Sequence, residues 1–534
     1  MHQYINLRGQ YGFSQTFSMD YSSVQDVLDQ MDRLGIWQTV VEFTGASNTL
    51  YRARRLIQEI SAIPNWRQRI IPCFATDAAL LFQDGAMESF IQLLKENSPC
   101  CISLFPKRFS YRLRLIDAVL DRLQDVCSVI LIDKKELSGD CAADDLIYLA
   151  NRYPEMSFVI RQVSWGGYNF LFDVMRRAKN VYVDNSRLHT RNALEMFHNH
   201  IGEGRVLFST DTRGNEGAAM APITFANLSD KAKNNIRYGT FISLFRRESD
   251  RRFLQENLRA IPNKIPNRFW TPFVEEGKAP DTEIYDIHCH MGMCGGGWNL
   301  MNAEFSTQVS AFEEDMDKYN VRRIVSSASG RPDLIEANLE MAAAVEGHDR
   351  FRGYVRYNPN FDQLYTDEYL DSLFATGYFI GLKTLPSYMG IEITDKRYER
   401  MFRYAHEHHL PVLIHTWQKN LGAPWACAEA ASRWPNAKVV CGHTGGGELG
   451  RIDCETIAQD PKYSNVYFEF CGSFGATRTW AKTLQSINPS RVLYGTDACL
   501  HDMGWEMSRL LSADIGDDDL IAILGQNAKR IYGF

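Results

Sequence analysis

The sequence predicts an α/β protein made of two tandem (β/α)8 barrels, of which only the second carries a functional site. Three observations predict this fold class: a length of 534 residues, a repeat that spans both halves, and an alternation of apolar runs with amphipathic segments. A single hydrophobic core stops growing at about 250–300 residues, so a chain of this length requires at least two domains.

The composition is that of a globular protein and excludes several classes of partner. Hydrophobic residues make up 45% of the chain and charged residues 23%, and the net charge of −7 offers no polycation for nucleic acid or an anionic membrane. The first residues lack a basic segment followed by an apolar one, and no uninterrupted apolar run reaches about 18 residues. We therefore expect a cytoplasmic protein that acts on a small molecule.

The two halves of the chain repeat each other at a nearly constant offset. Met31 in DVLDQMDRLGIWQTVV matches Met316 in AFEEDMDKYNVRRIVS at an offset of 285 residues, and NVYVD matches NVYFE at the same offset. The segment RVLFSTD, which ends at Asp211, matches RVLYGTD, which ends at Asp497, at an offset of 286. A shared offset across several elements indicates a duplication.

The second copy alternates eight apolar, β-branched runs with amphipathic segments such as LIEANLEMAAAVEG. In chain order the runs are EIYDIHCH, RRIVSSA, FRGYVRYN, YFIGLKTL, LPVLIHT, AKVVCGH, NVYFEF and RVLYGTD. Eight strands alternating with helices over about 250 residues is the pattern of one (β/α)8 barrel. A proline-containing stretch without clear period predicts a linker at 261–282, which separates a first domain, 1–260, from a second, 283–534.

Ligand-type side chains stand at the carboxyl ends of the second barrel's strands, where barrels of this kind place their chemistry. His288 and His290 alternate along the first strand, so both imidazoles face the same side. His415 and Asp497 each end another strand. Imidazole and carboxylate ligands suit zinc, manganese, iron or nickel better than magnesium or calcium. The pattern predicts a site for one divalent transition metal, with zinc as the first choice.

Further strand ends carry groups with more than one interpretation. His443 is predicted to be a catalytic acid/base or a group that orients water, and a ligand or structural role is the alternative. Lys383 is interpreted as a carboxylated lysine that bridges two ions, a charge partner for an anionic substrate, or a paired lysine near the rim. A second ion is expected only in the first case. Arg356 is a second candidate for binding a substrate anion, and Glu469 is assigned a supporting or core-paired role.

Several of these motifs together resemble the amidohydrolase-2 branch of the amidohydrolase superfamily, which includes aminocarboxymuconate-semialdehyde decarboxylase. They are Asp286-Ile-His-Cys-His, GLK ending at Lys383, the strand ends at His415 and His443, GTD at Asp497, and the closing GQNAKRIYGF. The resemblance covers residues 284–534. It implies that His288, His290, His415 and Asp497 bind one divalent metal, and that His443 helps handle the proton or the water. Because the branch contains hydrolases, non-oxidative decarboxylases and hydratases, the reaction stays open.

The first copy replaces most of these residues. Alignment of the two copies sets Arg8 against His288, Gln10 against His290, Ser103 against Lys383, Ile132 against His415, with Asp133 one step further, and Val163 against His443. Only Asp211, opposite Asp497, keeps a ligand type, and one carboxylate without histidine does not make a tight site. We expect an inactive first barrel that packs on the second as a pseudo-dimer, and a homo-oligomer is a further alternative.

The leading functional hypothesis is a metal-dependent hydrolase for a small substrate, which Arg356 and Lys383 suggest is carboxylated. A bound metal lowers the pKa of water from about 15.7 towards about 7–9, Asp497 accepts the proton, and His443 holds the water. One alternative is a non-oxidative decarboxylase that uses the same ion. A second alternative is a binding or scaffold protein in which both barrels are inert.

Overall fold

The computed structural model describes residues 1–12, 21–45, 47–210, 215–292, 303–330, 332–472 and 477–534. These residues form two compact units, and the boundary between the units lies between Ile265 and Pro266. Each unit contains an eight-stranded sheet in which the strands follow chain order and every neighbouring pair is parallel. The structure confirms the predicted pair of (β/α)8 barrels.

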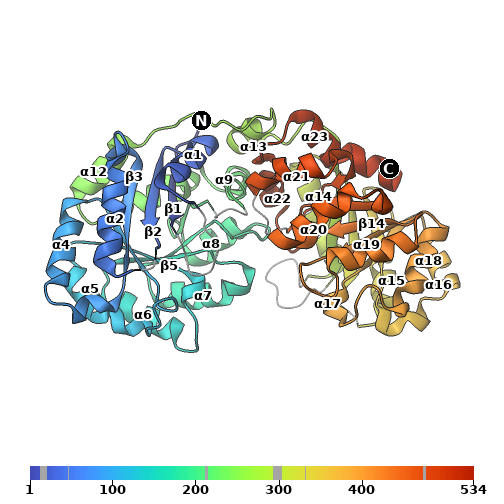
Figure 1. The fold of residues 1–534 in the computed structure, drawn as a ribbon, viewed down its shortest axis with the longest axis horizontal. Coiled ribbons are helices and arrows are strands. Elements are labelled where there is room, and N and C mark those ends of the chain that lie inside the picture. Colours follow the sequence, from blue (N-terminus) through green and yellow to red (C-terminus); the bar gives the residue numbers. More distant parts are fainter. Residues whose placement is uncertain (13–20, 46, 211–214, 293–302, 331, 473–476) are drawn as a thin grey trace. The chain divides into compact units, whose positions relative to one another are not determined.

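The first barrel carries its helices on the outside of the sheet, where α4, α5 and α6 can be followed in Figure 1. Its strands are β1 (Ile5–Tyr11), β2 (Gln38–Phe43), β3 (Ile70–Thr76), β4 (Cys101–Leu104), β5 (Val129–Asp133), β6 (Ser157–Arg161), β7 (Val181–Asp184) and β8 (Val206–Leu207). Its main helices are α1 (Val24–Leu34), α2 (Thr49–Ser61), α4 (Ala86–Glu96), α5 (Asp117–Leu123), α6 (Ala142–Arg152), α7 (Tyr168–Arg177), α8 (Ala193–Ile201), α9 (Met220–Phe225), α10 (Asp230–Asn234), α11 (Thr240–Ser243) and α12 (Glu248–Asn257).

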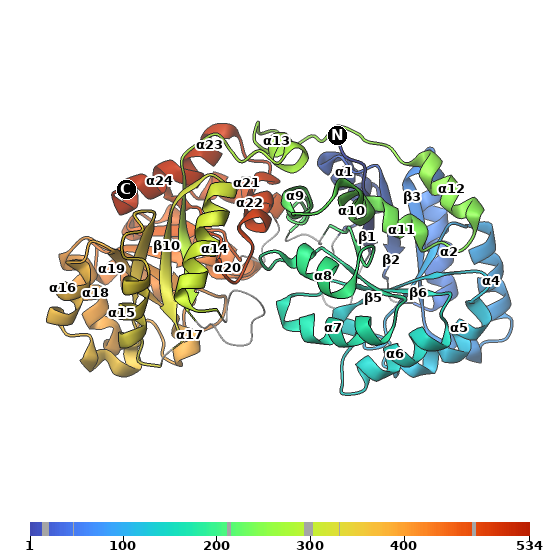
Figure 2. The same ribbon diagram turned by 180° about the vertical axis from the view of Figure 1, so that it is seen from behind.

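The second barrel has the same plan, and Figure 2 shows α15, α16 and α18 outside its strands. Its strands are β9 (Ile284–Gly292), β10 (Val321–Ser329), β11 (Phe351–Arg356), β12 (Phe379–Thr384), β13 (Pro411–His415), β14 (Lys438–Gly442), β15 (Val466–Glu469) and β16 (Val492–Leu493). Its main helices are α14 (Phe305–Lys318), α15 (Ile335–Ala344), α16 (Asp367–Phe374), α17 (Pro386–Met389), α18 (Glu399–Glu407), α19 (Pro424–Arg433), α20 (Glu448–Gln459), α21 (Trp480–Ser486), α22 (Met503–Leu511), α23 (Asp517–Ile521) and α24 (Asn527–Tyr532). Each of the eight predicted strands is present.

Local sequence signals set the ends of the first repeated helix, α1. Ser23 accepts a hydrogen bond from the backbone of Asp26, whose side chain in turn reaches the Ser23 backbone, so two amides of the first turn are satisfied. The helix stops at Gly35, which adopts φ 80° and ends the helix in the left-handed conformation that glycine tolerates best. Val27, Leu28 and other apolar residues on one face are buried against the sheet.

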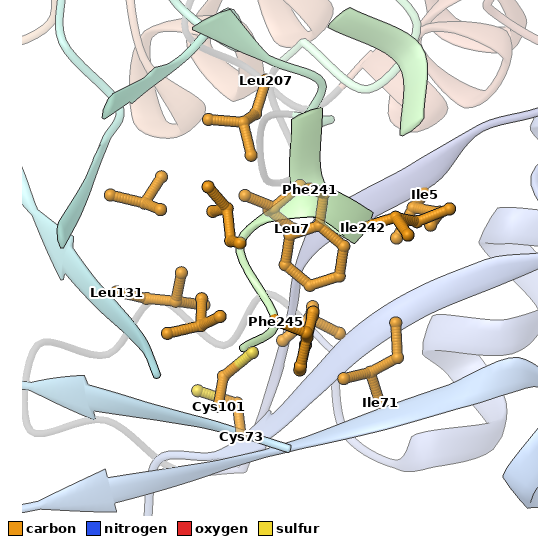
Figure 3. Close-up of a cluster of buried hydrophobic side chains, with 14 of the residues drawn as sticks. Ile5, Leu7, Ile71, Cys73, Cys101, Leu131, Leu207, Phe241, Ile242 and Phe245 are labelled. Atoms are coloured by element: carbon orange, nitrogen blue, oxygen red, sulfur yellow. The ribbon is translucent and has the colours of Figure 1, made fainter. Parts of the chain in front are cut away.

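Helix α11 and the residues just after it close the amino-terminal end of the first barrel. Figure 3 shows Phe241 and Phe245 among the side chains of Ile5, Leu7 and Leu131, which come from strands β1 and β5. Burial of such aromatic side chains stabilises the fold by a few kcal/mol each. Because apolar side chains fill this end, a polar site in the barrel has to lie at the carboxyl ends of the strands.

The second barrel is closed in the same way, and the duplication extends to a rare helix type. Ala528 and Ile531 of α24 pack on Tyr285, Ile287 and other strand residues at the amino-terminal end. One turn of π-helix precedes the closing helix in each barrel, at Asn235–Gly239 and at Ala522–Gln526. Since π-helical turns are uncommon, their repetition supports a common origin for the two barrels.

The predicted linker, 261–282, contains a helix, α13 (Trp270–Glu276), which packs in the second unit. Trp270 and Phe273 of this helix are fully buried, and Phe273 lies against Tyr319. Pro272 stands in the first turn, where its missing N–H needs no helical partner. Among the helices in the described part of the chain, none is both long and apolar enough to cross a membrane.

Candidate metal centre

Three of the predicted ligands converge at the carboxyl end of the second barrel. His288 and His290 lie on β9, and Asp497 follows β16. The Asp497 Oδ1 atom is 3.0 Å from His290 Nε2 and 3.5 Å from His288 Nε2. One ligand atom from each of the three side chains lies within 4.8 Å of the others, and all three residues are buried. The alternation of the two histidines along a strand therefore places both rings as expected.

Lys383 lies at the centre of this group and not near the barrel rim. Its side chain is fully buried, and Nζ contacts His288 Nε2 and lies 3.1 Å from His290 Nε2. Burial, with a smaller contribution from the charge of Arg356, lowers the pKa of Lys383 to about 7, although Asp497 acts in the opposite direction. A basic group that readily loses its charge therefore lies between the imidazoles and the carboxylate.

A second basic group, the guanidinium of Arg356, lies on the other side of His290. Arg356 ends β11 and is 7% exposed. Its NH1 is 3.4 Å from Ser327 Oγ, which lies 3.3 Å from His290 Nδ1. Burial and the charges of Lys383 and Arg356 together lower the pKa of His290 to about 3, although Asp497 acts in the opposite direction. His290 is therefore a neutral imidazole, the form that binds metals.

His415 and His443 form a directed hydrogen-bond chain beside this group. His443 Nδ1 lies 2.8 Å from the carbonyl oxygen of Cys471, which only accepts, so Nδ1 carries a proton. Burial lowers the pKa of His443, so its Nε2 is unprotonated and accepts from His415 Nδ1 at 3.0 Å. The Nε2 atom of His415 is then left with a lone pair. His415 stands outside the group of three, and its role as a ligand stays a prediction.

Glu469 fixes the orientation of His288. Its Oε2 lies 2.9 Å from His288 Nδ1 and also accepts the backbone N–H of His443 at 3.1 Å. Burial raises the pKa of Glu469 to about 8, and the charge of Asp497 adds to this effect. With Nδ1 directed at Glu469, the ring of His288 presents Nε2 to the centre. The assignment of Glu469 to a supporting role agrees with this geometry.

Sequence reasoning missed Cys471, which lies two residues beyond Glu469. Its Sγ atom is 3.2 Å from His288 Nδ1 and 3.8 Å from His443 Nδ1, and the four residues form a second group with metal-ligand spacing. The signal was present in the sequence, since Cys471 follows the seventh strand by two residues and period-two alternation places it on the side of Glu469.

The backbone of the site adopts left-handed conformations at two residues that carry chemistry. His443 has φ 61° and Asp497 has φ 60°, values that cost energy in residues other than glycine. Gly472 faces both: a Cβ atom added to it would lie 3.0 Å from His443 Nδ1 and 3.5 Å from Asp497 Oδ2. The packing around these residues holds them in conformations that a free chain rarely adopts.

Equivalent hydrogen bonds identify corresponding residues in the first barrel. The backbone N–H of Arg8 donates to Asn6 Oδ1 at 3.2 Å, just as His288 donates to Asp286 Oδ1 at 3.0 Å. Arg8 therefore corresponds to His288, as the alignment predicted, and Gln10 two residues further faces the same side. Ser103 also corresponds to Lys383, as predicted. Ser103 lies opposite Leu131 in the β4–β5 pair, and Lys383 lies opposite Leu413 at the same place in the β12–β13 pair.

The strand register corrects the alignment at His415. Strand β5 pairs with β6 so that Asp133 lies opposite Arg161, and β13 pairs with β14 so that His415 lies opposite Gly442. These are the last residue pairs of two strand pairs that have the same length, so Asp133 corresponds to His415 and Arg161 to Gly442. The placement of Ile132 at this position is wrong by one residue. A slip of one residue turns a side chain to the other face of the sheet.

The alignment is also wrong by one residue at His443, which corresponds to Gln162 and not to Val163. Gln162 has φ 59° and His443 has φ 61°. Each donates its backbone N–H to a carboxylate of the next strand, Gln162 to Asp184 at 2.8 Å and His443 to Glu469 at 3.1 Å. The unusual backbone of this position has thus been kept in both barrels, whereas the imidazole has not.

Ion pairs fill the centre of the first barrel. Asp133 lies 2.8 Å from Arg161 Nε and 3.2 Å from Arg8 NH1, and Glu42 lies 3.4 Å from Arg161 NH2. Burial alone would raise the pKa of Asp133, but the two guanidinium groups hold it well below its usual range. Asp211 lies outside the described residues. Among the residues described, every group with metal-ligand spacing lies in the second barrel.

Comparison with known proteins gives one family and several distant structures. A family described as amidohydrolase matches residues 285–534. No curated protein matches the chain. Similar solved structures include 5-carboxyvanillate decarboxylase from Sphingomonas paucimobilis, with 13% identity over 48% of this chain and 100% of that chain and a TM-score of 0.36. The 2,6-dihydroxybenzoate decarboxylase from Rhizobium has 14% identity over 47% and 99% of the two chains, with a TM-score of 0.38.

A third structure, a dihydroxybenzoic acid decarboxylase from Polaromonas, contains manganese and the inhibitor 2-nitroresorcinol. It has 14% identity over 47% of this chain and 97% of that chain, with a TM-score of 0.38. The family match covers the second barrel from Tyr285 in its first strand to the last residue, and it includes every residue of the candidate metal centre. The C-terminal half of this chain belongs to the amidohydrolase family.

Proposed function

We propose that the second barrel is a metal-dependent lyase that removes CO2 from a small carboxylated substrate. The observation that carries this proposal is a pair of buried basic side chains, Lys383 and Arg356, on either side of His290. Two basic groups beside a group of metal-ligand type attract an anionic substrate more strongly than a neutral one. A carboxylate paired with them would also lie beside the three side chains with metal-ligand spacing.

The residues present fit a divalent transition metal. Asp497 Oδ1 is buried and forms no hydrogen bond of good geometry among the described residues, although two imidazole nitrogens face it. Hydrogen bonds at Nδ1 leave His288 and His415 with Nε2 as a donor to a metal. Zinc is the first choice for such nitrogen and oxygen donors, and manganese, iron and nickel also suit them. The bound metal supplies positive charge that stabilises electron density developing on the substrate.

The protein's own residues then bind the substrate and move one proton. Arg356 pairs with an anionic group of the substrate, and the burial of the site excludes most water. The bond between the carboxyl carbon and its neighbour breaks, CO2 leaves, and the electron pair stays on the neighbouring carbon. Asp497 Oδ2, on the side of Gly472, passes a proton from solvent to that carbon. His443 holds His415 in place through the Nε2–Nδ1 hydrogen bond.

Hydrolysis is the second candidate, and the state of Asp497 favours it. Burial would raise the pKa of Asp497, but the neighbouring imidazoles of His290, His288 and His443 hold it well below its usual range. An ionised carboxylate at this position accepts a proton readily, which a hydrolase needs when it activates water. The metal and its ligands would serve both reactions, so the two candidates differ in the bond that breaks and in whether water supplies an oxygen atom to the product.

Product analysis separates the two reactions. The metal-loaded protein is incubated with a panel of small carboxylic acids, esters and amides in water enriched in oxygen-18. A lyase releases CO2 and gives a product with one carboxyl group fewer and no solvent oxygen. Incorporation of oxygen-18 into the product without CO2 release would favour the hydrolase. Metal content far below one ion per chain after gentle purification would instead favour a non-catalytic binding or scaffold protein.

For the first barrel we propose a supporting role without catalysis. The proposal rests on the ion pairs of Arg8 and Arg161 with Asp133, which stand where the second barrel has its ligands. A pseudo-dimer with the second barrel is the arrangement that the duplication favours. The two units can be tested separately by expressing residues 266–534. A fragment with the full activity and stability of the whole chain would exclude a required supporting role.

A further inference from the structure

An exposed tyrosine stands beside the predicted metal ligand His415. Tyr388, in the short helix α17, is 75% exposed. Its ring centroid lies 5.3 Å from that of His415, and the two ring planes meet at 82°. Edge-to-face packing at this separation is a favourable contact between aromatic rings. Tyr388 therefore touches His415 with one part of its ring and presents most of its side chain to solvent.

A row of rings connects Tyr388 with the candidate metal centre. Ring centroids are 4.6 Å apart from His415 to His443, 4.9 Å from His443 to His288, and 5.5 Å from His288 to His290. Each of these separations lies in the range of ring contact. The exposed fraction is 75% at Tyr388 and 5% at His290. Tyr388 is therefore the solvent end of the row, and His290 is its buried end.

The backbone around Tyr388 is anchored on both sides. Helix α17 begins almost directly after β12, and its first residue, Pro386, packs on Gly422: a Cβ atom added to this glycine would lie 3.3 Å from Pro386 Cγ. At the other end of the helix, the side-chain amide of Asn360 donates to the carbonyl oxygen of Met389 at 3.0 Å. The position of the tyrosine is therefore set by its neighbours in the chain, although its own ring is mostly exposed.

A second aromatic side chain, Trp417, flanks His415 from the loop after β13. Its ring is nearly parallel to the imidazole, with 6.1 Å between the centroids and 6° between the planes. Gly446 has φ 73°, and a Cβ atom at this position would overlap with the Trp417 ring, so glycine is needed for this packing. Aromatic surface therefore borders the centre at His415, whereas the basic side chain of Lys383 borders it at His290.

We propose that Tyr388 is a substrate-binding residue on which an apolar part of the substrate packs, while the substrate carboxylate lies at the buried end of the row. This inference rests on the proposed function, because it takes the substrate to be carboxylated. It adds that the substrate has an apolar body large enough to reach from His290 past His415. A ring that is exposed in the free protein has much surface to remove from water when such a ligand binds.

The affinities of simple carboxylates test the proposal without a known substrate. The full chain is loaded with Zn²⁺ and titrated with acetate, benzoate and cyclohexanecarboxylate in a calorimeter. At least one of the two ring acids is expected to bind about tenfold more tightly than acetate, because its ring covers Tyr388. Tyr388→Ala should remove most of this advantage and change the affinity for acetate by less than about twofold. Tyr388→Phe should keep the advantage, because the contact uses the ring and not the hydroxyl.

Tyr51 offers a matched control, since it is a 55% exposed tyrosine on α2 of the first barrel. Tyr51→Ala should change none of the three affinities. Both tyrosines are exposed, so their replacement should leave the chain folded, which circular dichroism checks.

The proposal fails if neither ring acid binds more tightly than acetate, or if Tyr388→Ala keeps the advantage or weakens acetate equally. It also fails if Tyr388→Phe loses the advantage as fully as Tyr388→Ala. Failure of the proposed function has a different signature: no CO2 is released from any acid, while the ring-acid advantage and its loss in Tyr388→Ala are unchanged.

Discussion

Arg161 of the first barrel and Gly442 of the second occupy the same register position, opposite Asp133 and His415 respectively. Gly442 leaves space for the ring of His288, whose Cε1 would lie 3.4 Å from a Cβ atom added to the glycine. Arg161 instead extends a long side chain into the centre and pairs with two carboxylates there. This exchange explains why the first barrel fills the position with a guanidinium, whereas the second leaves it to the ring of His288.

We predict that Arg161→Ala destabilises the protein by about 3–5 kcal/mol, because it leaves Asp133 and Glu42 buried without their main partner. Urea unfolding of the purified variant measures the loss. Arg122→Ala is the control, since Arg122 forms an exposed pair with Glu88 and should change stability by less than about 1 kcal/mol. Metal content should be unchanged in both variants. Loss of metal in a folded Arg161→Ala protein would contradict the assignment of the site to the second barrel.

His288→Ala or Asp497→Ala should remove both bound metal and turnover, because each supplies an atom to the group of three. Metal analysis by mass spectrometry on the purified variants gives the ion content directly. Asp211→Ala, at the corresponding position of the first barrel, should keep one ion per chain and full turnover. A folded but inactive Asp211→Ala variant would overturn the prediction that the first barrel is inactive.

Glu469→Gln should lower metal affinity by about 10–100-fold while the protein stays folded. The amide keeps the size of the side chain but cannot ionise to the carboxylate that accepts most strongly from His288 Nδ1. Competition with a chelator of known affinity measures the change. Glu313→Gln removes the carboxylate of an equivalent histidine pair far from the centre and should have no effect on the metal. Equal affinities in wild type and Glu469→Gln would show that His288 needs no carboxylate partner.

The sequence was sufficient for the architecture and for the convergence of His288, His290 and Asp497, because strand periodicity and the rule about strand ends both apply without tertiary detail. It was insufficient wherever one residue of register mattered. The alignment missed Asp133 as the counterpart of His415 and Gln162 as the counterpart of His443, each by one position. The sequences around them match poorly, and an alignment alone does not show which residues are paired between neighbouring strands. The position of Lys383 inside the group could not be predicted either, because its burial depends on how eight strands close.

The network around His443 was beyond sequence reasoning for a different reason. The spacing of His415, His443 and Cys471 along the chain carries no information about which ring nitrogen is protonated. That assignment follows only from the 2.8 Å approach of His443 Nδ1 to a carbonyl oxygen.

Asp184, the first-barrel counterpart of Glu469, gives a prediction about pH that involves no metal. Burial raises the pKa of Asp184 to about 6, although the hydrogen bond from Gln162 and the charge of Arg161 act in the opposite direction. The unfolded chain has an ordinary value near 3.9. As the pH rises from 4 to 6, the unfolded state releases its proton first, so the contribution of Asp184 to stability falls across this range and then levels off.

Asp184→Asn removes this penalty, because the amide carries no charge and its oxygen still accepts the Gln162 N–H, which lies at 2.8 Å in the wild type. We expect the variant to be more stable than wild type by on the order of 2 kcal/mol at pH 8, and about equal to it at pH 4. Urea unfolding at the two pH values measures both differences. Asp173→Asn, on the surface of α7, should show no such pH-dependent gain. A gain for Asp184→Asn that is the same at pH 4 and pH 8 would mean that its cause is packing and not the buried charge.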